Sequence, residues 1–155
     1  MEAYELTTQG GATDFARLIE ACQSFGSYCL IGGLALNCYV EPVSTLDVDV
    51  VVKIEEHLHS LNVRPPESDL RIQFTTDERY QGFLTRCVDG DVLGLRVKVA
   101  SLEDVTQGKL WAYGDFRRRL SRRKKDELDL IRLAEAYPAL KSLYPSELIE
   151  QIERG

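Results

Sequence analysis

Two aspartates, Asp47 and Asp49, stand two positions apart in the valine-rich segment 46–53. Residues i and i+2 of a β-strand leave the same face, so both carboxylates would share one face while Val48 and Val50 point toward the core. Adjacent carboxylates repel each other and lose hydration unless a cation lies between them. Phosphoryl-type transfer uses such a cation, because Mg²⁺ bridges nucleotide phosphates and neutralises developing charge. The pair is therefore a candidate Mg²⁺ site.

A second motif, Gly32-Gly33, follows the short apolar segment 27–31. A strand, a Gly-Gly turn and a helix in succession allow backbone amides to approach a phosphate at the helix N-terminus. Taken alone, the glycines indicate a tight turn and the acids a solvated strand end. Together, at this spacing, they favour a functional site.

The segment from Tyr28 to Val52, YCLIGGLALNCYVEPVSTLDVDVVV, resembles the first motif of the minimal nucleotidyltransferases of the DNA polymerase beta superfamily. More narrowly, it is similar to stand-alone bacterial proteins related to the AbiEii toxin group. In that family a Gly-Gly or Gly-Ser turn precedes an Asp-x-Asp pair by about a dozen residues, and thirteen intervene here. Two later segments resemble further motifs of the family: QGKLWAYGD with Lys109, and KKDELDLIRL with Lys125, Asp126 and Asp129.

The resemblance, which covers residues 25–135 or so, implies transfer of a nucleoside monophosphate from an NTP to a protein or RNA acceptor. It also implies Mg²⁺ dependence and a place in a toxin–antitoxin-type system. Asp47 and Asp49 would be catalytic and hold the metal, and Gly32, Gly33 and Thr45 would bind the nucleotide. The remaining nucleotide-binding residues, on the far side of the cleft, would be Lys109, Lys125 and Asp126.

The sequence departs from the family in two places. Val43 stands where an arginine often precedes the acid pair. Active members also carry a third carboxylate on a neighbouring strand, whereas the expected strand 95–99 has Arg96 and Lys98 on its polar face. A third acid could instead come from a loop, and the candidates are Asp89, Asp91 and Glu103.

These departures leave two hypotheses, of which the enzyme is favoured. In the alternative, Lys98 neutralises Asp47 and Asp49, no metal enters, and the chain is a catalytically degenerate module that acts through protein or nucleic-acid contacts.

A basic run lies between Arg117 and Lys125, with seven basic residues and no acid. The rest of the chain has 25 acids against 12 bases (19 minus 7), an excess that argues against general nucleic-acid binding. Such runs are most often solvated surface. As a functional surface, this one would dock an acidic partner or an RNA backbone. The contacts would come from Arg117, Arg118, Arg122 and Arg123.

Hydrophobic periodicity, turn residues and β-branched runs predict the elements that position these residues. Helices are expected at 13–25, 34–39, 55–61, 102–114, 122–136 and 146–153. Strands are expected at 27–31, 46–53, 70–74, 82–88 and 95–99, with turns at 76–78 and 89–90. This order predicts an α+β fold, a mixed sheet backed by helices with a C-terminal helical lobe. It would form one domain over 1–155, with its core at 13–100 and its helical part at 102–155.

The bulk composition, 44% hydrophobic and 28% charged over 155 residues, is that of a globular domain. Apolar runs are too short for a bilayer, and the first residues lack the features of a signal peptide, so a cytoplasmic location without membrane contact is expected. His57 and His59 are expected to be surface residues, and Trp111 to be packed in the core. The four cysteines form no Cys-x-x-Cys pair and are expected to be buried free thiols: Cys22, Cys29, Cys38 and Cys87.

Overall fold

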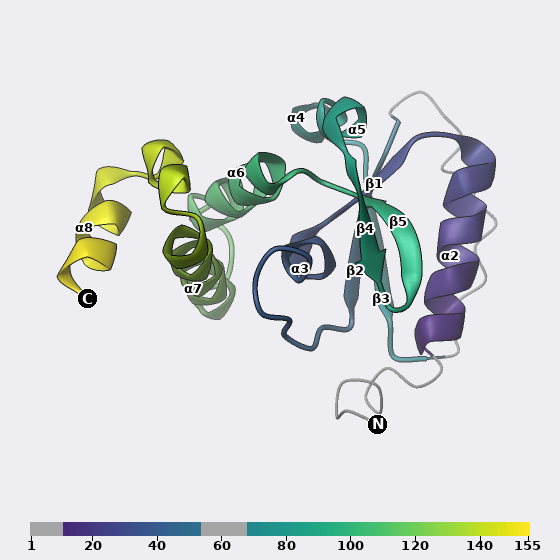
Figure 1. Cartoon of the computed structure of the whole chain (residues 1–155), viewed down its shortest axis with the longest axis horizontal. Helices are drawn as coiled ribbons and strands as arrows, with labels where there is room; N and C mark the ends of the chain where they lie inside the picture. The colour runs from purple at the N-terminus through teal and green to yellow at the C-terminus, as the bar shows by residue number, and fades with distance from the viewer. Residues whose placement is uncertain (1–10, 54–67) are drawn as a thin grey trace. The chain divides into compact units, whose positions relative to one another are not determined.

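The computed structural model describes residues 11–53 and 68–155 of the chain. It divides the chain into two compact units, Met1–Ser101 and Leu102–Gly155. The first contains a mixed β-sheet with short helices, and the second is helical (Figure 1). Within the described ranges, every helix is too short or too polar to cross a lipid bilayer.

The sheet of the first unit has five strands: β1 (Tyr28–Ile31), β2 (Asp47–Val52), β3 (Arg71–Thr75), β4 (Val88–Val92) and β5 (Leu95–Val99). Their order in the sheet is β3-β2-β1-β5-β4. The central strand β1 pairs antiparallel with β2 and parallel with β5. The outer pairs are β2 with β3, which is parallel, and β4 with β5, which is antiparallel. The mixed sheet confirms the predicted fold class.

The longest helix of this unit, α2 (Gly11–Phe25), lies along one face of the sheet, and α3 (Gly32–Leu36) lies on the other (Figure 1). The helical spacing of apolar residues in α2 explains its packing, because the side chains three and four apart all face the core. These buried side chains are Phe15, Leu18, Ile19 and Cys22. On the sheet they are matched by the fully buried Leu30, Val48 and Val50.

The predicted strand 82–88 is wrong. Residues 78–86 form two short helices, α4 (Glu78–Gln81) and α5 (Phe83–Arg86). Asp77, which was expected in a polar turn, is the N-cap of α4 and accepts a hydrogen bond from the backbone N–H of Arg79 at 3.0 Å. An N-cap aspartate accepts a hydrogen bond from a backbone amide that has no partner within the helix. This cap favours a helix here, although the apolar pattern of the sequence indicated a strand.

The predicted turn at Asp89-Gly90 is also wrong, because both residues lie inside β4 and the hairpin turns at Leu93-Gly94. Both turn residues have positive φ, 49° and 81°, as a two-residue hairpin turn requires. Gly90 instead allows close packing, since a Cβ there would lie 3.0 Å from Cγ2 of Val99. The predicted helix 55–61, His57 and His59 lie outside the described residues.

The second unit confirms all three predicted C-terminal helices, α6 (Leu102–Tyr113), α7 (Leu120–Ala136) and α8 (Ser146–Arg154), and adds the short 3-10 helix η2 (Pro138–Leu143). Its apolar core contains Leu130, Leu133, Ala134 and Leu148, which are fully buried. The hydroxyl of Tyr144 donates a hydrogen bond to the carbonyl of Leu130 at 2.5 Å, and burial raises the pKa of this phenol to about 12. Trp111 is only partly buried.

The cysteines follow the prediction in part. Cys22 and Cys29 are buried, and burial raises the pKa of the Cys22 thiol to about 11. Cys38 is exposed and Cys87 is partly exposed, so the expectation that all four are buried is wrong for these two. All four are free thiols, as predicted.

Candidate nucleotide-binding site

The two aspartates of the motif lie at the start of β2 on one face of the sheet. Val48 and Val50, which alternate with them, are fully buried on the opposite face, whereas Asp47 and Asp49 are partly exposed. The strand begins where the backbone N–H of Asp47 donates to the hydroxyl of Thr45 at 3.2 Å. The predicted alternation of acids and valines is therefore present.

The Gly-Gly turn packs directly against Asp49 of this pair and against Thr45. Gly32 has φ +71°, and a Cβ at this position would lie 2.6 Å from Oδ2 of Asp49. A Cβ on Gly33 would lie 3.4 Å from Cγ2 of Thr45. The register explains the proximity, since Ile31 at the end of β1 pairs with Asp49. The structure thus brings Gly32, Gly33, Thr45 and Asp49 into one corner.

Replacing Gly32 by alanine is expected to displace the Asp49 carboxylate as well as to strain the backbone. Gly94→Ala is the matched control, because Gly94 has a similar φ of +81° and no atom within 4 Å of its hypothetical Cβ. The left-handed conformation costs about 1–2 kcal/mol in either variant. Only Gly32→Ala should lower the affinity for Mg²⁺, measured by calorimetric titration alongside urea unfolding. Equal metal affinities in the two variants would contradict the close packing of Gly32 on Asp49.

A cation that sequence reasoning missed lies beside the acid pair. Nε of Arg71 on β3 is 2.7 Å from Oδ1 of Asp47. The parallel register pairs Asp47 with Arg71 and Asp49 with Gln73, and the amide of Arg71 donates to the carbonyl of Leu46 at 2.8 Å. The pattern Arg-x-Gln at the start of a predicted strand was the available signal. Which strand it would pair with could not be derived from one sequence.

The expectation that Lys98 neutralises the acid pair is wrong. Lys98 lies on β5, which β1 separates from β2, and its Nζ is 2.6 Å from Oδ1 of Asp89 on β4. The hydrogen bond and the opposite charge lower the pKa of Asp89 and raise that of Lys98. Asp91, another candidate third acid, pairs with Arg96 at 3.3 Å in the same hairpin.

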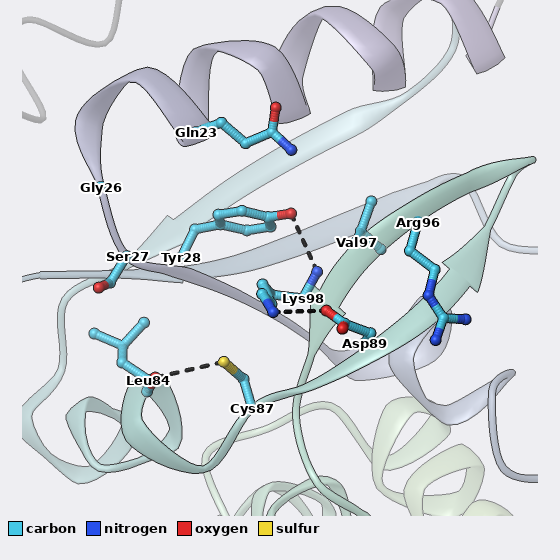
Figure 2. A pocket seen from close by; sticks show the side chains of 10 residues that line it. All are labelled: Gln23, Gly26, Ser27, Tyr28, Leu84, Cys87, Asp89, Arg96, Val97 and Lys98. Carbon is cyan, nitrogen blue, oxygen red and sulfur yellow. Dashed lines mark hydrogen bonds and ion pairs between the residues drawn. The ribbon is translucent and has the colours of Figure 1, made fainter.

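The pair of Lys98 and Asp89 lines a groove of about 410 Å³ between the end of α2, α5 and the β4–β5 hairpin (Figure 2). Tyr28 forms part of its wall, and its hydroxyl accepts a hydrogen bond from the backbone N–H of Lys98 at 3.1 Å. Lys98 therefore belongs to this groove.

The donor set at the start of β2 suits one divalent cation. Carboxylate oxygens are the ligands that Mg²⁺ prefers, and Asp47 and Asp49 present theirs from one face. On β3 the positions in register with them hold Arg71 and Gln73. Within residues 11–53 and 68–155, three His, Cys, Asp or Glu side chains nowhere gather closely enough to hold a metal ion.

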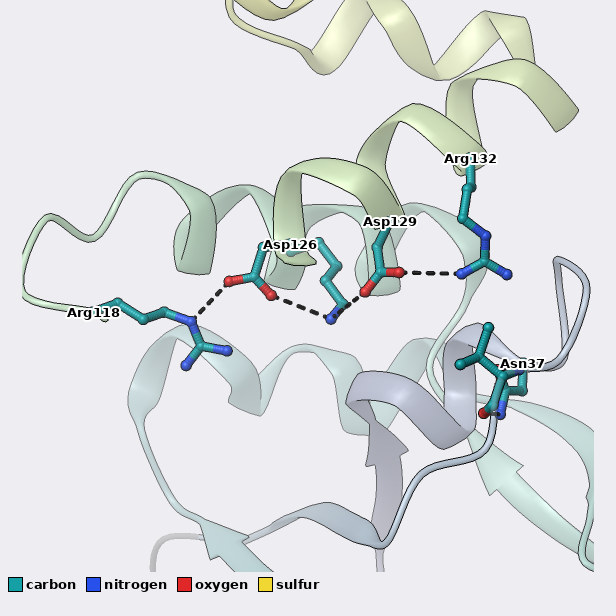
Figure 3. A network of polar contacts seen from close by, with 7 residues as sticks. Asn37, Arg118, Asp126, Asp129 and Arg132 are labelled. Atoms are coloured by element: carbon teal, nitrogen blue, oxygen red, sulfur yellow. Dashed lines mark hydrogen bonds and ion pairs between the residues drawn. The ribbon is translucent and has the colours of Figure 1, made fainter. Parts of the chain in front are cut away.

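The helical unit contains a buried network of charges (Figure 3). Nζ of Lys109 on α6 lies 3.3 Å from Oδ1 of Asp126 and 3.0 Å from Oδ2 of Asp129, both on α7. Two arginines complete it: Nε of Arg118 lies 2.7 Å from Asp126, and Nη1 of Arg132 lies 3.1 Å from Asp129. Of the predicted nucleotide-binding residues in this unit, Lys109 and Asp126 are thus in contact, and Lys125 has an exposed side chain.

The basic run is divided by this network. Arg118 points toward Asp126 and pairs with it, so this arginine belongs to the charge network although it is partly exposed. Arg117 is 93% exposed, and the neighbouring Phe116 is 83% exposed. The guanidinium of Arg123 lies over the ring of Phe116, 4.9 Å from its centre. The outward surface therefore combines an aromatic ring with positive charge.

Comparisons with known proteins place the fold. No protein-family model matches the sequence, and no curated protein matches it. Over 92% of this chain and 88% of the other, the structure is similar to that of the antibiotic-resistance factor ANT(2'')-Ia, with a TM-score of 0.52 and 12% identity. An antigenic nucleotidyltransferase-like protein from Paracoccidioides brasiliensis matches with a TM-score of 0.49 and 17% identity over 99% of this chain and 94% of that one. The chain has a nucleotidyltransferase fold.

Proposed function

We propose that the chain is a Mg²⁺-dependent nucleotidyltransferase that transfers a nucleoside monophosphate from an NTP to a macromolecular acceptor. The observation that carries this proposal is the corner in which Gly32 touches the carboxylate of Asp49 beside Asp47. Because Gly32 has no side chain, the Asp49 carboxylate can lie against the turn, so a metal ion held by this carboxylate would lie close to backbone amides that suit phosphates. The nucleotidyltransferase fold supports the same chemistry.

In the reaction, the oxygen of an acceptor hydroxyl forms a bond to the α-phosphorus of the NTP, and its proton passes to solvent. The bond from that phosphorus to the oxygen bridging to the β-phosphorus breaks, and pyrophosphate leaves. Asp47 and Asp49 would hold the metal ion, which neutralises the charge that develops on the phosphates. Gly32, Gly33 and Thr45 would position the triphosphate. Nucleotide contacts of Lys109, Lys125 and Asp126 stay predictions from the sequence resemblance, as do the relation to the AbiEii group and a toxin–antitoxin role.

The ion pair between Arg71 and Asp47 is weak enough for a metal ion to displace it. The Arg71 side chain is 68% exposed and that of Asp47 is 31% exposed. Ion pairs exposed to this extent contribute about 0–1 kcal/mol, because solvent screens them. A divalent cation bound by two carboxylates and a triphosphate gains several kcal/mol and would displace such a contact.

The test is calorimetric titration of the chain with each of the four NTPs in the presence of Mg²⁺, followed by detection of pyrophosphate release with candidate acceptors. Binding of at least one NTP, with its affinity dependent on Mg²⁺, is expected. The absence of binding for all four, together with an unchanged melting temperature, would refute the proposal.

A second candidate, the catalytically degenerate binding module, is favoured by one observation. The positive charge beside Asp47 comes from Arg71 rather than from the predicted Lys98, with Nε of Arg71 2.7 Å from Oδ1 of Asp47. If this charge fully replaces a metal ion, the chain would bind neither Mg²⁺ nor Mn²⁺ and would act through protein contacts. Metal titration separates the two candidates, since the enzyme requires a bound divalent ion and the module excludes one.

We propose RNA as the acceptor, docked on Phe116 and the arginines around it. Exposed aromatic rings stack on bases, and guanidinium groups neutralise the RNA backbone. The double substitution Phe116→Ala and Arg117→Gln is expected to weaken binding of a single-stranded RNA about 10-fold to 100-fold, because stacking is worth about 1–3 kcal/mol per base. Fluorescence anisotropy of a labelled oligonucleotide measures this loss, with Arg154→Gln as an exposed control. Binding that these replacements leave unchanged would exclude this surface.

A further inference from the structure

Arg71 lies beside the acid pair, on the neighbouring strand β3 and in register with Asp47. Enzymes of phosphoryl transfer often use two divalent cations about 3.5–4 Å apart, held by several carboxylates. Here β3 presents Arg71 opposite Asp47 and Gln73 opposite Asp49. We infer that this site binds a single divalent cation and that the guanidinium of Arg71 takes the place of a second one. Arg71 would then be a positioning residue for the triphosphate, and this inference rests on the proposed function.

The charge balance supports this assignment. Three carboxylates with two divalent cations leave one positive charge for the nucleotide. Two carboxylates with one divalent cation and one guanidinium leave the same charge. Arg71 in place of a third acid therefore gives a triphosphate the same net charge, while a second metal ion would lack the ligands that it needs.

The geometry of the side chain fits the same role. The contact to Asp47 uses Nε, and a guanidinium has further N–H groups in the same plane. These planar donors match the oxygens of phosphates in pairs. The backbone of Arg71 is fixed by its hydrogen bond to Leu46, so its side chain starts from a defined place beside β2. Because this side chain is largely exposed, it can turn from Asp47 to a phosphate without unpacking the core.

Two measurements on the full chain with opposite expected signs test the inference. In the first, Mn²⁺ binding without nucleotide is followed by electron paramagnetic resonance of the free ion. Arg71→Gln should bind Mn²⁺ up to about fivefold more tightly than the native chain, because an exposed ion pair that competes for Asp47 is worth at most about 1 kcal/mol. In the second, Arg71→Gln should bind an ATP analogue with a methylene group between its α and β phosphorus atoms about 10-fold to 100-fold more weakly in Mn²⁺.

Arg96→Gln is the matched control, because Arg96 is 66% exposed and also pairs with an aspartate, Asp91, on a neighbouring strand. It should change neither affinity. Arg71→Lys should restore part of the nucleotide affinity, since it keeps the charge and loses the planar donors. Circular dichroism melting confirms that each variant is folded.

Native mass spectrometry with Mn²⁺ and the analogue gives the stoichiometry. One Mn²⁺ per chain is expected, and two in the native chain would overturn the inference while leaving the proposed function intact. Nucleotide affinity that Arg71→Gln leaves unchanged would overturn it in the same way. A native chain that binds neither Mn²⁺ nor the analogue would refute the proposed function and this inference together.

Discussion

Replacing Asp49 by asparagine is expected to weaken the binding of Mg²⁺·ATP at least about 100-fold, which corresponds to about 2.7 kcal/mol. Asparagine keeps the size of the side chain, so the packing against Gly32 is preserved and only the negative charge is lost. A hard divalent cation depends strongly on carboxylate charge, and the register on β3 supplies no acid to replace it. Asp47→Asn should have an effect in the same direction.

The measurement is isothermal titration calorimetry with ATP at a fixed Mg²⁺ concentration. Asp91→Asn serves as the control, because Asp91 is also a strand aspartate paired with an arginine and lies in the β4–β5 hairpin. It should bind Mg²⁺·ATP as the native chain does. Equal losses in Asp49→Asn and Asp91→Asn would show that the metal ion responds to the net charge of the chain rather than to this pair.

Replacing Lys109 by methionine is expected to destabilise the helical unit by about 3–5 kcal/mol. The Lys109 side chain is 12% exposed and contacts two aspartates whose side chains are 1% and 6% exposed. Its removal leaves Asp126 and Asp129 buried with less compensating charge, and methionine fills the volume without satisfying them. Urea unfolding followed by the fluorescence of Trp111, the single tryptophan, which lies on α6, reports on this unit.

Lys124→Met is the matched control for this prediction. Nζ of Lys124 lies 3.2 Å from Glu127, but its side chain is 66% exposed. Ion pairs of this kind contribute about 0–1 kcal/mol, so the control should unfold nearly as the native chain does. Similar losses in the two variants would contradict the assignment of the buried network as a determinant of stability.

The sequence predicted those parts of the fold that depend on local patterns. The alternation of aspartate and valine gave the face of β2 on which the carboxylates lie, and helical spacing gave α2, α6, α7 and α8. The errors arose where a short signal had two interpretations. Asp89-Gly90 has the composition of a turn, but long-range pairing with β5 places it in a strand.

In the candidate site too, contacts between residues close in sequence could be predicted, and contacts that depend on strand order could not. Gly32 and Asp49 are close in sequence, since only the short helix α3 and a loop separate the paired strands β1 and β2. Arg71 could not be assigned, because the parallel pairing of β2 with β3 depends on packing across the whole sheet. For the same reason Lys98 was placed beside the wrong acids: sheet order decides its partner, and a single sequence does not contain that order.

The sheet order also has a consequence for how the chain folds. On one side, the central strand β1 pairs with β2, which follows it closely in sequence. On its other side, β1 pairs with the distant strand β5, where Leu30 is in register with Val99. A chain that emerges from the ribosome can form the Gly32–Asp49 corner early, from contacts short in sequence, while the middle of its sheet stays open. Closing such a long loop slows folding, whereas the helical unit depends on local contacts and folds faster. The sheet of the first unit therefore cannot be completed until β5 has been synthesised.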